Sequence, residues 1–166
     1  DTGSGALSGE EWDTVIGFAD RMKVLPLLSS MIQRKPLISP PDAVLERLRY
    51  EYLFNASRTL VFTRELEKIL ASFHDAGIEA IPLKGAYLAH TVYERPALRQ
   101  MVDLDILVHW EQMDAAIRLL EGLGYIPVSK PVLDAGYRAA YHHYPVFLHP
   151  SGVRVELHWA ITHEFR

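Results

Sequence analysis

Cysteine is absent from this chain of 166 residues. Its absence excludes disulfides, thiolate catalysis and cysteine-bound zinc. Long apolar runs are missing as well, since none approaches the roughly 20 residues that a membrane span requires. The first six residues lack the basic and apolar parts of a signal peptide. We therefore expect a cytoplasmic protein with a flexible N-terminal leader and no membrane partner.

A large excess of charge of one sign is also absent, with 17 basic and 21 acidic residues. The formal net charge is −4 and the isoelectric point is near 6.1. A protein with a broad nucleic-acid surface normally has clustered basic residues, so such a surface is not expected here. A small local groove of basic residues is the remaining alternative. Hydrophobic residues make up 49% of the chain and charged residues 23%, and both are ordinary globular values. The chain is long enough for one domain with a real core.

The first half of the chain has the pattern of a helical region. Ser8 and Glu11 form a capping-box pair, and apolar residues then recur at helical spacing. A second short helix is expected over residues 25–33. A third is expected from Asp42 to about residue 76, with residues 55–57 as a candidate break and Gly77 as its stop. Residues 1–76 are therefore predicted to form a helical N-terminal region.

The second half alternates between strand-like and helical patterns. Pro150-Ser-Gly152 is a turn signal, and the runs on either side of it predict a hairpin. The predicted fold class is α+β, with the helical region followed by a small mixed β-sheet and flanking helices over residues 77–166. Strands are expected at 78–82, 102–108, 125–128, 144–149 and 153–159, and helices at 85–93 and 111–123.

Two carboxylates stand in the predicted strand 102–108. Strand side chains alternate between faces, so Asp103 and Asp105 share one face. Val102, Leu104, Ile106 and Val108 share the other face and are expected to enter the core. Two like charges about 4 Å apart repel by on the order of 4 kcal/mol at an effective dielectric near 20. A proton, a cationic side chain or a metal must compensate them, and oxygen ligands favour Mg²⁺ or Mn²⁺. The alternative is a solvated pair at a strand end.

Glu156 is a third acid in the middle of a predicted strand. It would complete a three-carboxylate cluster if its strand lies beside the first; otherwise it belongs to the solvated face of an edge hairpin. Lys84-Gly85 forms a second feature, between a predicted strand and the next helix. A glycine at a helix start lets a phosphate approach the backbone amides at the positive end of the helix dipole. An ordinary turn is the alternative for Lys84-Gly85.

Histidines and tyrosines are dense near the C-terminus, but no H-E-x-x-H or comparable ligand spacing occurs among them. A histidine metal site is therefore not expected. His158 shares a face with Glu156 and is the one histidine expected to reach the acids. Tyr137, Tyr141 and Tyr144 could stack a base, but such residues also commonly fill cores or interfaces. The C-terminal histidines are His142, His143, His149, His158 and His163.

The order of these features resembles the nucleotidyltransferase superfamily typified by DNA polymerase beta. The closer resemblance is to a bacterial branch of mostly uncharacterised nucleotidyltransferases related to abortive-infection toxins. That branch is usually longer, so a C-terminal portion is predicted to be missing here. The resemblance covers most of the chain and rests on residues 81–89, Tyr93, Arg99, residues 102–108, Gly124-Tyr125 and residues 155–159.

The resemblance implies a catalytic metal site. Asp103, Asp105 and Glu156 would be the catalytic acids and would bind Mg²⁺ or Mn²⁺. Glu156 would also activate the acceptor hydroxyl. Two metal ions roughly 3.5–4 Å apart would then hold the attacking and leaving oxygens of an in-line displacement at the α-phosphate.

The resemblance also implies a nucleotide site. Gly85 and the amides after it, beginning with Ala86, would hold the triphosphate. The superfamily usually has Gly-Ser at this turn, so Lys84 would replace the serine contact. Arg99 would contact a phosphate or form a salt bridge to the acids, and both readings stay open.

The function expected is therefore transfer of an NMP group from an NTP, such as ATP, to a hydroxyl on a small molecule, a protein or an RNA end. The alternative is a non-catalytic or regulatory nucleotide-binding module that keeps the fold. A purely structural helical interaction protein ranks last, because it would leave all three acids unexplained.

Overall fold

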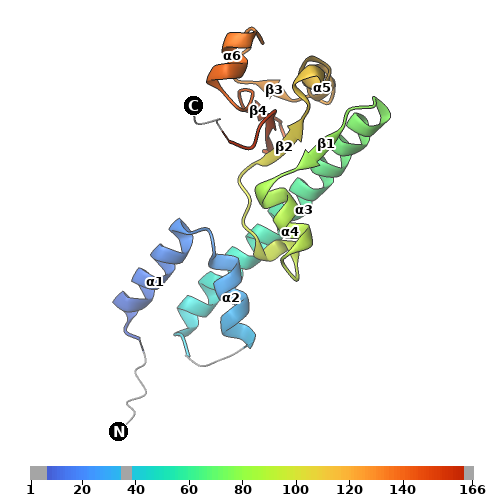
Figure 1. The fold of residues 1–166 in the computed structure, drawn as a ribbon. Helices are drawn as coiled ribbons and strands as arrows, with labels where there is room; N and C mark the ends of the chain where they lie inside the picture. Colours follow the sequence, from blue (N-terminus) through green and yellow to red (C-terminus); the bar gives the residue numbers. More distant parts are fainter. Residues whose placement is uncertain (1–6, 35–38, 163–166) are drawn as a thin grey trace. The chain divides into compact units, whose positions relative to one another are not determined.

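The computed structural model describes residues 7–34 and 39–162, so the predicted leader and His163 lie outside the described residues. The fold is α+β, as predicted (Figure 1). The order of elements is α1 (Gly9–Arg21), α2 (Leu25–Arg34), α3 (Asp42–Asp75), β1 (Ala80–Pro82), α4 (Lys84–Thr91), the 3₁₀ turn η1 (Pro96–Leu98), β2 (Leu104–Val108), the 3₁₀ turn η2 (Trp110–Gln112), α5 (Met113–Gly122), β3 (Ile126–Pro127), α6 (Ala135–Ala140), β4 (Phe147–Leu148) and β5 (Arg154–His158).

The chain divides into two compact units. Unit 1 comprises Asp1–Thr59 and Ala89–Gln100, and unit 2 comprises Leu60–Leu88 and Met101–Arg166. Two of the boundaries fall within helices, because α3 and α4 each contribute residues to both units. The domain boundary predicted between residues 76 and 77 follows the change in secondary structure and stays a prediction.

Unit 1 is helical, and its predicted capping box is confirmed. The Glu11 N–H donates to the Ser8 hydroxyl and the Ser8 N–H donates to the Glu11 carboxylate. The expected break at residues 55–57 is wrong, because α3 continues through them. Asn55 is buried, and its side-chain amide donates to the Ala97 carbonyl at 2.7 Å. This bond satisfies the polar group, so a bend in the helix is not needed.

Unit 2 contains a five-stranded mixed sheet in the order β1-β2-β5-β4-β3. The pairing of β2 with β5 is parallel, and the other three pairings are antiparallel. The predicted hairpin is confirmed as β4 and β5. Gly77 follows α3 with a φ of +69°, a backbone conformation that suits glycine at a helix end. The apolar face of the two central strands is buried, through Leu104, Ile106, Val108, Val155 and Leu157.

The structure corrects the predicted limits of the acid-bearing strand. β2 begins at Leu104, so Asp103 lies just before it, and Val102 is 49% exposed and does not enter the core. The reason is pairing: the β5 ladder starts at Leu104, and β1 reaches only to Ile106. Residues 102 and 103 therefore have no strand beside them among the described residues.

The short helix α6 was not predicted from the sequence. Its start signal is Asp134, whose carboxylate accepts from the Tyr137 N–H at 2.8 Å. An aspartate in this position is a common N-terminal cap. Within residues 7–34 and 39–162, no helix has the length and apolar character needed to cross a bilayer.

Candidate functional site

The parallel register of β2 and β5 brings two predicted acids together. Asp105 and Glu156 are direct partners across the two strands, so their side chains point to the same face of the sheet. Asp105 is buried, whereas the Glu156 side chain is 25% exposed. The alternative of a solvated edge hairpin does not hold for Glu156, since β5 is an interior strand.

Asp105 accepts two close hydrogen bonds on one oxygen. Lys84 Nζ lies 2.6 Å and His158 Nε2 lies 2.8 Å from Asp105 Oδ1. Burial by itself would raise the pKa of Asp105, but the bonds and charges of these two partners outweigh burial and lower it. Asp105 is therefore held as a carboxylate. The prediction that His158 reaches the acids is confirmed.

Lys84 has an unusual backbone conformation at the first position of α4. Its φ is +44°, in the left-handed region that non-glycine residues rarely adopt. The preceding Leu83 N–H donates to the Asp105 carbonyl at 2.9 Å, which ties this turn to β2. Burial lowers the pKa of Lys84, but the hydrogen bond to Asp105 and the nearby acid charges raise it overall. Strain of this kind often accompanies a functional site.

Gly85 and Ala86 lie in the first turn of α4, and both are buried. A Cβ on Gly85 would meet Met101 Cγ at 3.1 Å, so the glycine permits a close approach of α4 to the segment before β2. The Tyr87 N–H bonds to the Leu83 carbonyl and is an early helical bond. The amides of Gly85 and Ala86 precede it, in the part of a helix where N–H groups lack intrahelical partners.

Asp103 is the acid with the least compensation. Burial raises its pKa, the charges of Asp105 and Glu156 raise it further, and Lys84 and His158 only partly oppose this. Negative charge therefore exceeds positive charge around Asp103. The one positive charge of Lys84 does not neutralise these three carboxylates.

The donor set fits a divalent cation. One ligand atom each from Asp105, Glu156 and His158 lie within 4.8 Å of one another. Two carboxylates and an imidazole suit Mn²⁺, and the carboxylates also suit Mg²⁺. Asp103 is not a member of this group, whereas His158 is. Ligand-spacing rules did not identify His158 as a candidate ligand, because the three residues of this group come from two strands. The alternation that places His158 on the same face as Glu156 was the available signal.

The buried ring of His158 has one further feature. Among the described residues, its Nδ1 has no hydrogen-bond partner. The rings of His142 and His143 have centroids 5.6 and 5.3 Å from that of His158. His143 Nδ1 lies 2.9 Å from the Tyr144 carbonyl. Three imidazoles thus gather beside the acids.

Arg99 belongs to unit 1, whereas the acids belong to unit 2. Its carbonyl lies 3.4 Å from the Asn55 side-chain amide, and its Nε is buried without a hydrogen-bond partner among the described residues. Its contact to a phosphate or to the acids stays a prediction.

One family of known proteins matches nearly the whole chain. This family, described as uncharacterised nucleotidyltransferase, matches residues 8–166. No curated protein and no solved structure matches the chain. The family match includes every residue of the predicted site. The chain therefore belongs to this family of uncharacterised nucleotidyltransferases.

Proposed function

We propose that the protein transfers an NMP group from an NTP to an acceptor hydroxyl, with Mg²⁺ or Mn²⁺ as cofactor. The observation that supports this most directly is the register that sets Asp105 directly opposite Glu156 on parallel strands. Burial of a like-charged pair costs several kcal/mol unless a cation compensates it. Asp103 adds a third negative charge, and Lys84 supplies only one positive charge.

Each site residue has a role in the proposed reaction. Asp103, Asp105 and Glu156 would hold the cations, and His158 orients Asp105. The amides of Gly85 and Ala86 would bind the triphosphate, and the Lys84 ammonium would move from Asp105 to the phosphates. Two bound Mg²⁺ ions would supply charge neutralisation at the attacking and leaving oxygens.

The proposed reaction makes one bond and breaks another. The acceptor oxygen forms a bond to the α-phosphorus, and the bond from that phosphorus to the bridging oxygen of the β-phosphate breaks. Pyrophosphate leaves with the electron pair of that bond. The hydroxyl proton passes to the Glu156 carboxylate, which is the more exposed member of the Asp105–Glu156 pair. The protein thereby contributes positioning and charge, the usual means of phosphoryl transfer.

Labelled nucleotides test the proposal. The protein is incubated with each α-³²P-labelled NTP, Mg²⁺ and cell extract, and label in an acid-stable product is measured. We expect transfer by the wild-type protein and a loss on the order of 10³-fold in Asp105→Asn, because several kcal/mol of transition-state stabilisation disappear. Glu67→Gln, which removes an exposed acid of α3, is the matched control. Persistent labelling by Asp105→Asn would contradict the assignment.

A non-catalytic nucleotide-binding module is the second candidate, and the Lys84–Asp105 ion pair favours it. The ammonium of Lys84, 2.6 Å from Asp105, can take the place of a bound cation. In that case NTP binds without turnover, and Lys84→Met does not restore transfer. An enzyme whose lysine contacts phosphate instead turns over in the wild type and loses affinity for NTP in Lys84→Met.

A further inference from the structure

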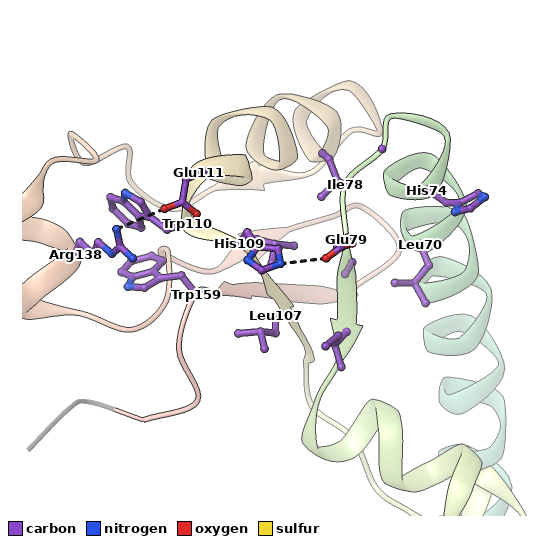
Figure 2. A pocket seen from close by; sticks show the side chains of 14 residues that line it. Leu70, His74, Ile78, Glu79, Leu107, His109, Trp110, Glu111, Arg138 and Trp159 are labelled. Carbon is purple, nitrogen blue, oxygen red and sulfur yellow. Dashed lines mark hydrogen bonds and ion pairs between the residues drawn. The ribbon is translucent and has the colours of Figure 1, made fainter.

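An open hollow of about 950 Å³ lies on unit 2, lined by residues of α3, the β1 strand, the C-terminal end of β2 and the segment after β5. Figure 2 shows Leu107 and His109 at the end of β2, with Trp110, Trp159 and Arg138 grouped to one side. Its volume is in the range of small-molecule sites. None of the residues assigned to the catalytic acids or to the α4 turn lines it.

Two indoles form the aromatic part of the hollow. Trp110 follows β2 and Trp159 follows β5. Because these strands are parallel, both rings lie at the C-terminal end of the two strands. Their centroids are 4.8 Å apart at an interplanar angle of 74°. The Arg138 guanidinium lies 5.3 Å from the Trp110 centroid. Indole faces of this kind pack against flat rings.

One exposed hydrogen bond and one exposed ion pair supply polar groups. His109 Nε2 lies 3.1 Å from a Glu79 oxygen, and Arg138 Nη1 lies 3.7 Å from a Glu111 oxygen (Figure 2). All four side chains are more than half exposed, so these pairs contribute little to stability. Their donors and acceptors can therefore turn toward the polar edge of a ligand at little cost.

The hollow adjoins the acids along the strand direction. Leu107 lines it and lies two residues after Asp105 on the same face, a distance of about 7 Å along a strand. The opposite partner of Leu107 is His158, which bonds Asp105 and directly precedes Trp159. The hollow thus begins where the acid cluster ends.

The in-line geometry of the proposed reaction sends three parts of the substrates in different directions: the pyrophosphate, the acceptor and the nucleoside. Lys84, at the start of α4, bonds Asp105 of β2, and Asp105 faces Glu156 of β5, which gives a row from Lys84 through Asp105 to Glu156. If pyrophosphate leaves on the Lys84 side, an in-line attack brings the acceptor from the Glu156 side. The nucleoside is bonded to the tetrahedral α-phosphorus and must depart sideways from that row. Along β2, one sideways direction leads past Asp103 and the other past Leu107, and the direction past Leu107 leads to the indoles.

We propose that this hollow binds the nucleobase of the NTP, with the base packed against the indoles of Trp110 and Trp159. This inference rests on the proposed function, because it places the nucleoside of the same nucleotide. Glu79 and Arg138 face the polar edge of the base. Carboxylates accept from exocyclic amino groups, and guanidinium groups donate to base oxygens and nitrogens.

Tryptophan fluorescence measures binding of a base at this site. The chain has three tryptophans, and the third, Trp12, is buried in unit 1. In a Trp12→Phe protein, emission comes from Trp110 and Trp159 alone. The probes are the four NTPs with Mg²⁺ and, as the matched ligand without a nucleoside, inorganic tripolyphosphate with Mg²⁺. We expect saturable quenching by at least one NTP, and competition without quenching by tripolyphosphate.

Affinity measurements complete the test. By calorimetry, Trp159→Ala is expected to weaken NTP binding about tenfold, a loss typical of one base–aromatic stack, and to leave tripolyphosphate binding unchanged. Trp159→Phe, which keeps a ring and is the milder change, should retain most of the affinity. Tyr50→Ala, at an exposed aromatic of unit 1, is the control.

Each other outcome overturns the base site. If tripolyphosphate binds as tightly as every NTP, or if NTP binds without a change in emission, the hollow does not hold the base, and the proposed phosphate site stands. If Trp159→Ala weakens both ligands equally, the indole acts on folding and not on the base. If neither ligand binds, the proposed function fails and the base site fails with it.

Discussion

Two carboxylates, Glu65 and Asp105, are buried among the described residues of unit 2. Glu65 of α3 is 7% exposed, and its oxygens accept from the Tyr125 hydroxyl at 2.9 Å and from Lys68 Nζ at 2.7 Å. Asp105 of β2 is 4% exposed and accepts from Lys84 and His158. Each side chain is therefore satisfied by two donors, and each has a pKa below its ordinary value.

The two carboxylates differ in their acidic neighbours. Asp105 has Glu156 as its direct strand partner, and its charge raises the pKa of Asp103. The groups that shift the pKa of Glu65 include no second acid among the described residues. Burial of a carboxylate alone therefore does not indicate a site. Surplus negative charge around an already bonded carboxylate is the feature that supports the proposed cation site.

The largest expected contrast is the response to a divalent cation. Mn²⁺ at 100 times its dissociation constant should stabilise the wild-type protein by about 2.7 kcal/mol. Asp105→Asn should lose this stabilisation, because its amide is a poor ligand, while Glu65→Gln should keep it. Thermal unfolding with and without Mn²⁺ measures both. An equal shift in wild type and Asp105→Asn would place the cation elsewhere.

Removal of the Tyr125 hydroxyl affects the other carboxylate. Tyr125→Phe leaves the buried Glu65 oxygen without its donor. The loss should lower the free energy of unfolding by roughly 2 kcal/mol, the cost of an unsatisfied buried acceptor. Nucleotide transfer should be unchanged at a temperature where the variant is folded. Urea unfolding measures the first effect and labelled transfer the second. A variant as stable as the wild type would show that water replaces the hydroxyl.

Asp103→Asn should raise the free energy of unfolding of the metal-free protein, whereas Tyr125→Phe lowers it. The change removes repulsion with Asp105 and Glu156. We therefore expect a gain of about 1 kcal/mol in the presence of EDTA, as is common when a functional charge is removed. Transfer should fall at the same time. Urea unfolding in EDTA tests the gain, and a loss of stability there would mean that Asp103 is compensated by contacts of its own.

The smallest expected effect is a pH dependence at Glu65. Burial raises the pKa of Glu65, but the bonds from Lys68 and Tyr125 lower it below its ordinary value of 4.5. Its contribution is therefore complete above the unfolded pKa and is lost as the pH falls through the lowered folded pKa. Lys68 is half exposed, so Glu65→Gln should cost only about 0.5 kcal/mol at pH 7 and progressively less as the pH falls through the lowered folded pKa of Glu65. Urea unfolding across this range measures the difference, and a cost that does not change with pH would contradict the expectation.

Much of the local structure could be predicted from the sequence. The capping box at Ser8, the hairpin turn at Gly152 and the stop at Gly77 are confirmed, because each depends on a few adjacent residues. The limits of β2 and the break at Asn55 were predicted wrongly. Strand ends depend on the partner strand, and Asn55 is satisfied by a carbonyl 42 residues away.

By itself, the sequence determined the α+β class and the turn at Lys84-Gly85, and it singled out three acids as the predicted site, because these follow from periodicity and residue chemistry along the chain. Only the tertiary structure decided that Asp105 faces Glu156, that His158 joins them and that Trp110 and Trp159 meet at one sheet edge. The physical reason is the parallel pairing of β2 with β5. Residues about 50 positions apart become neighbours through a register that no local pattern encodes.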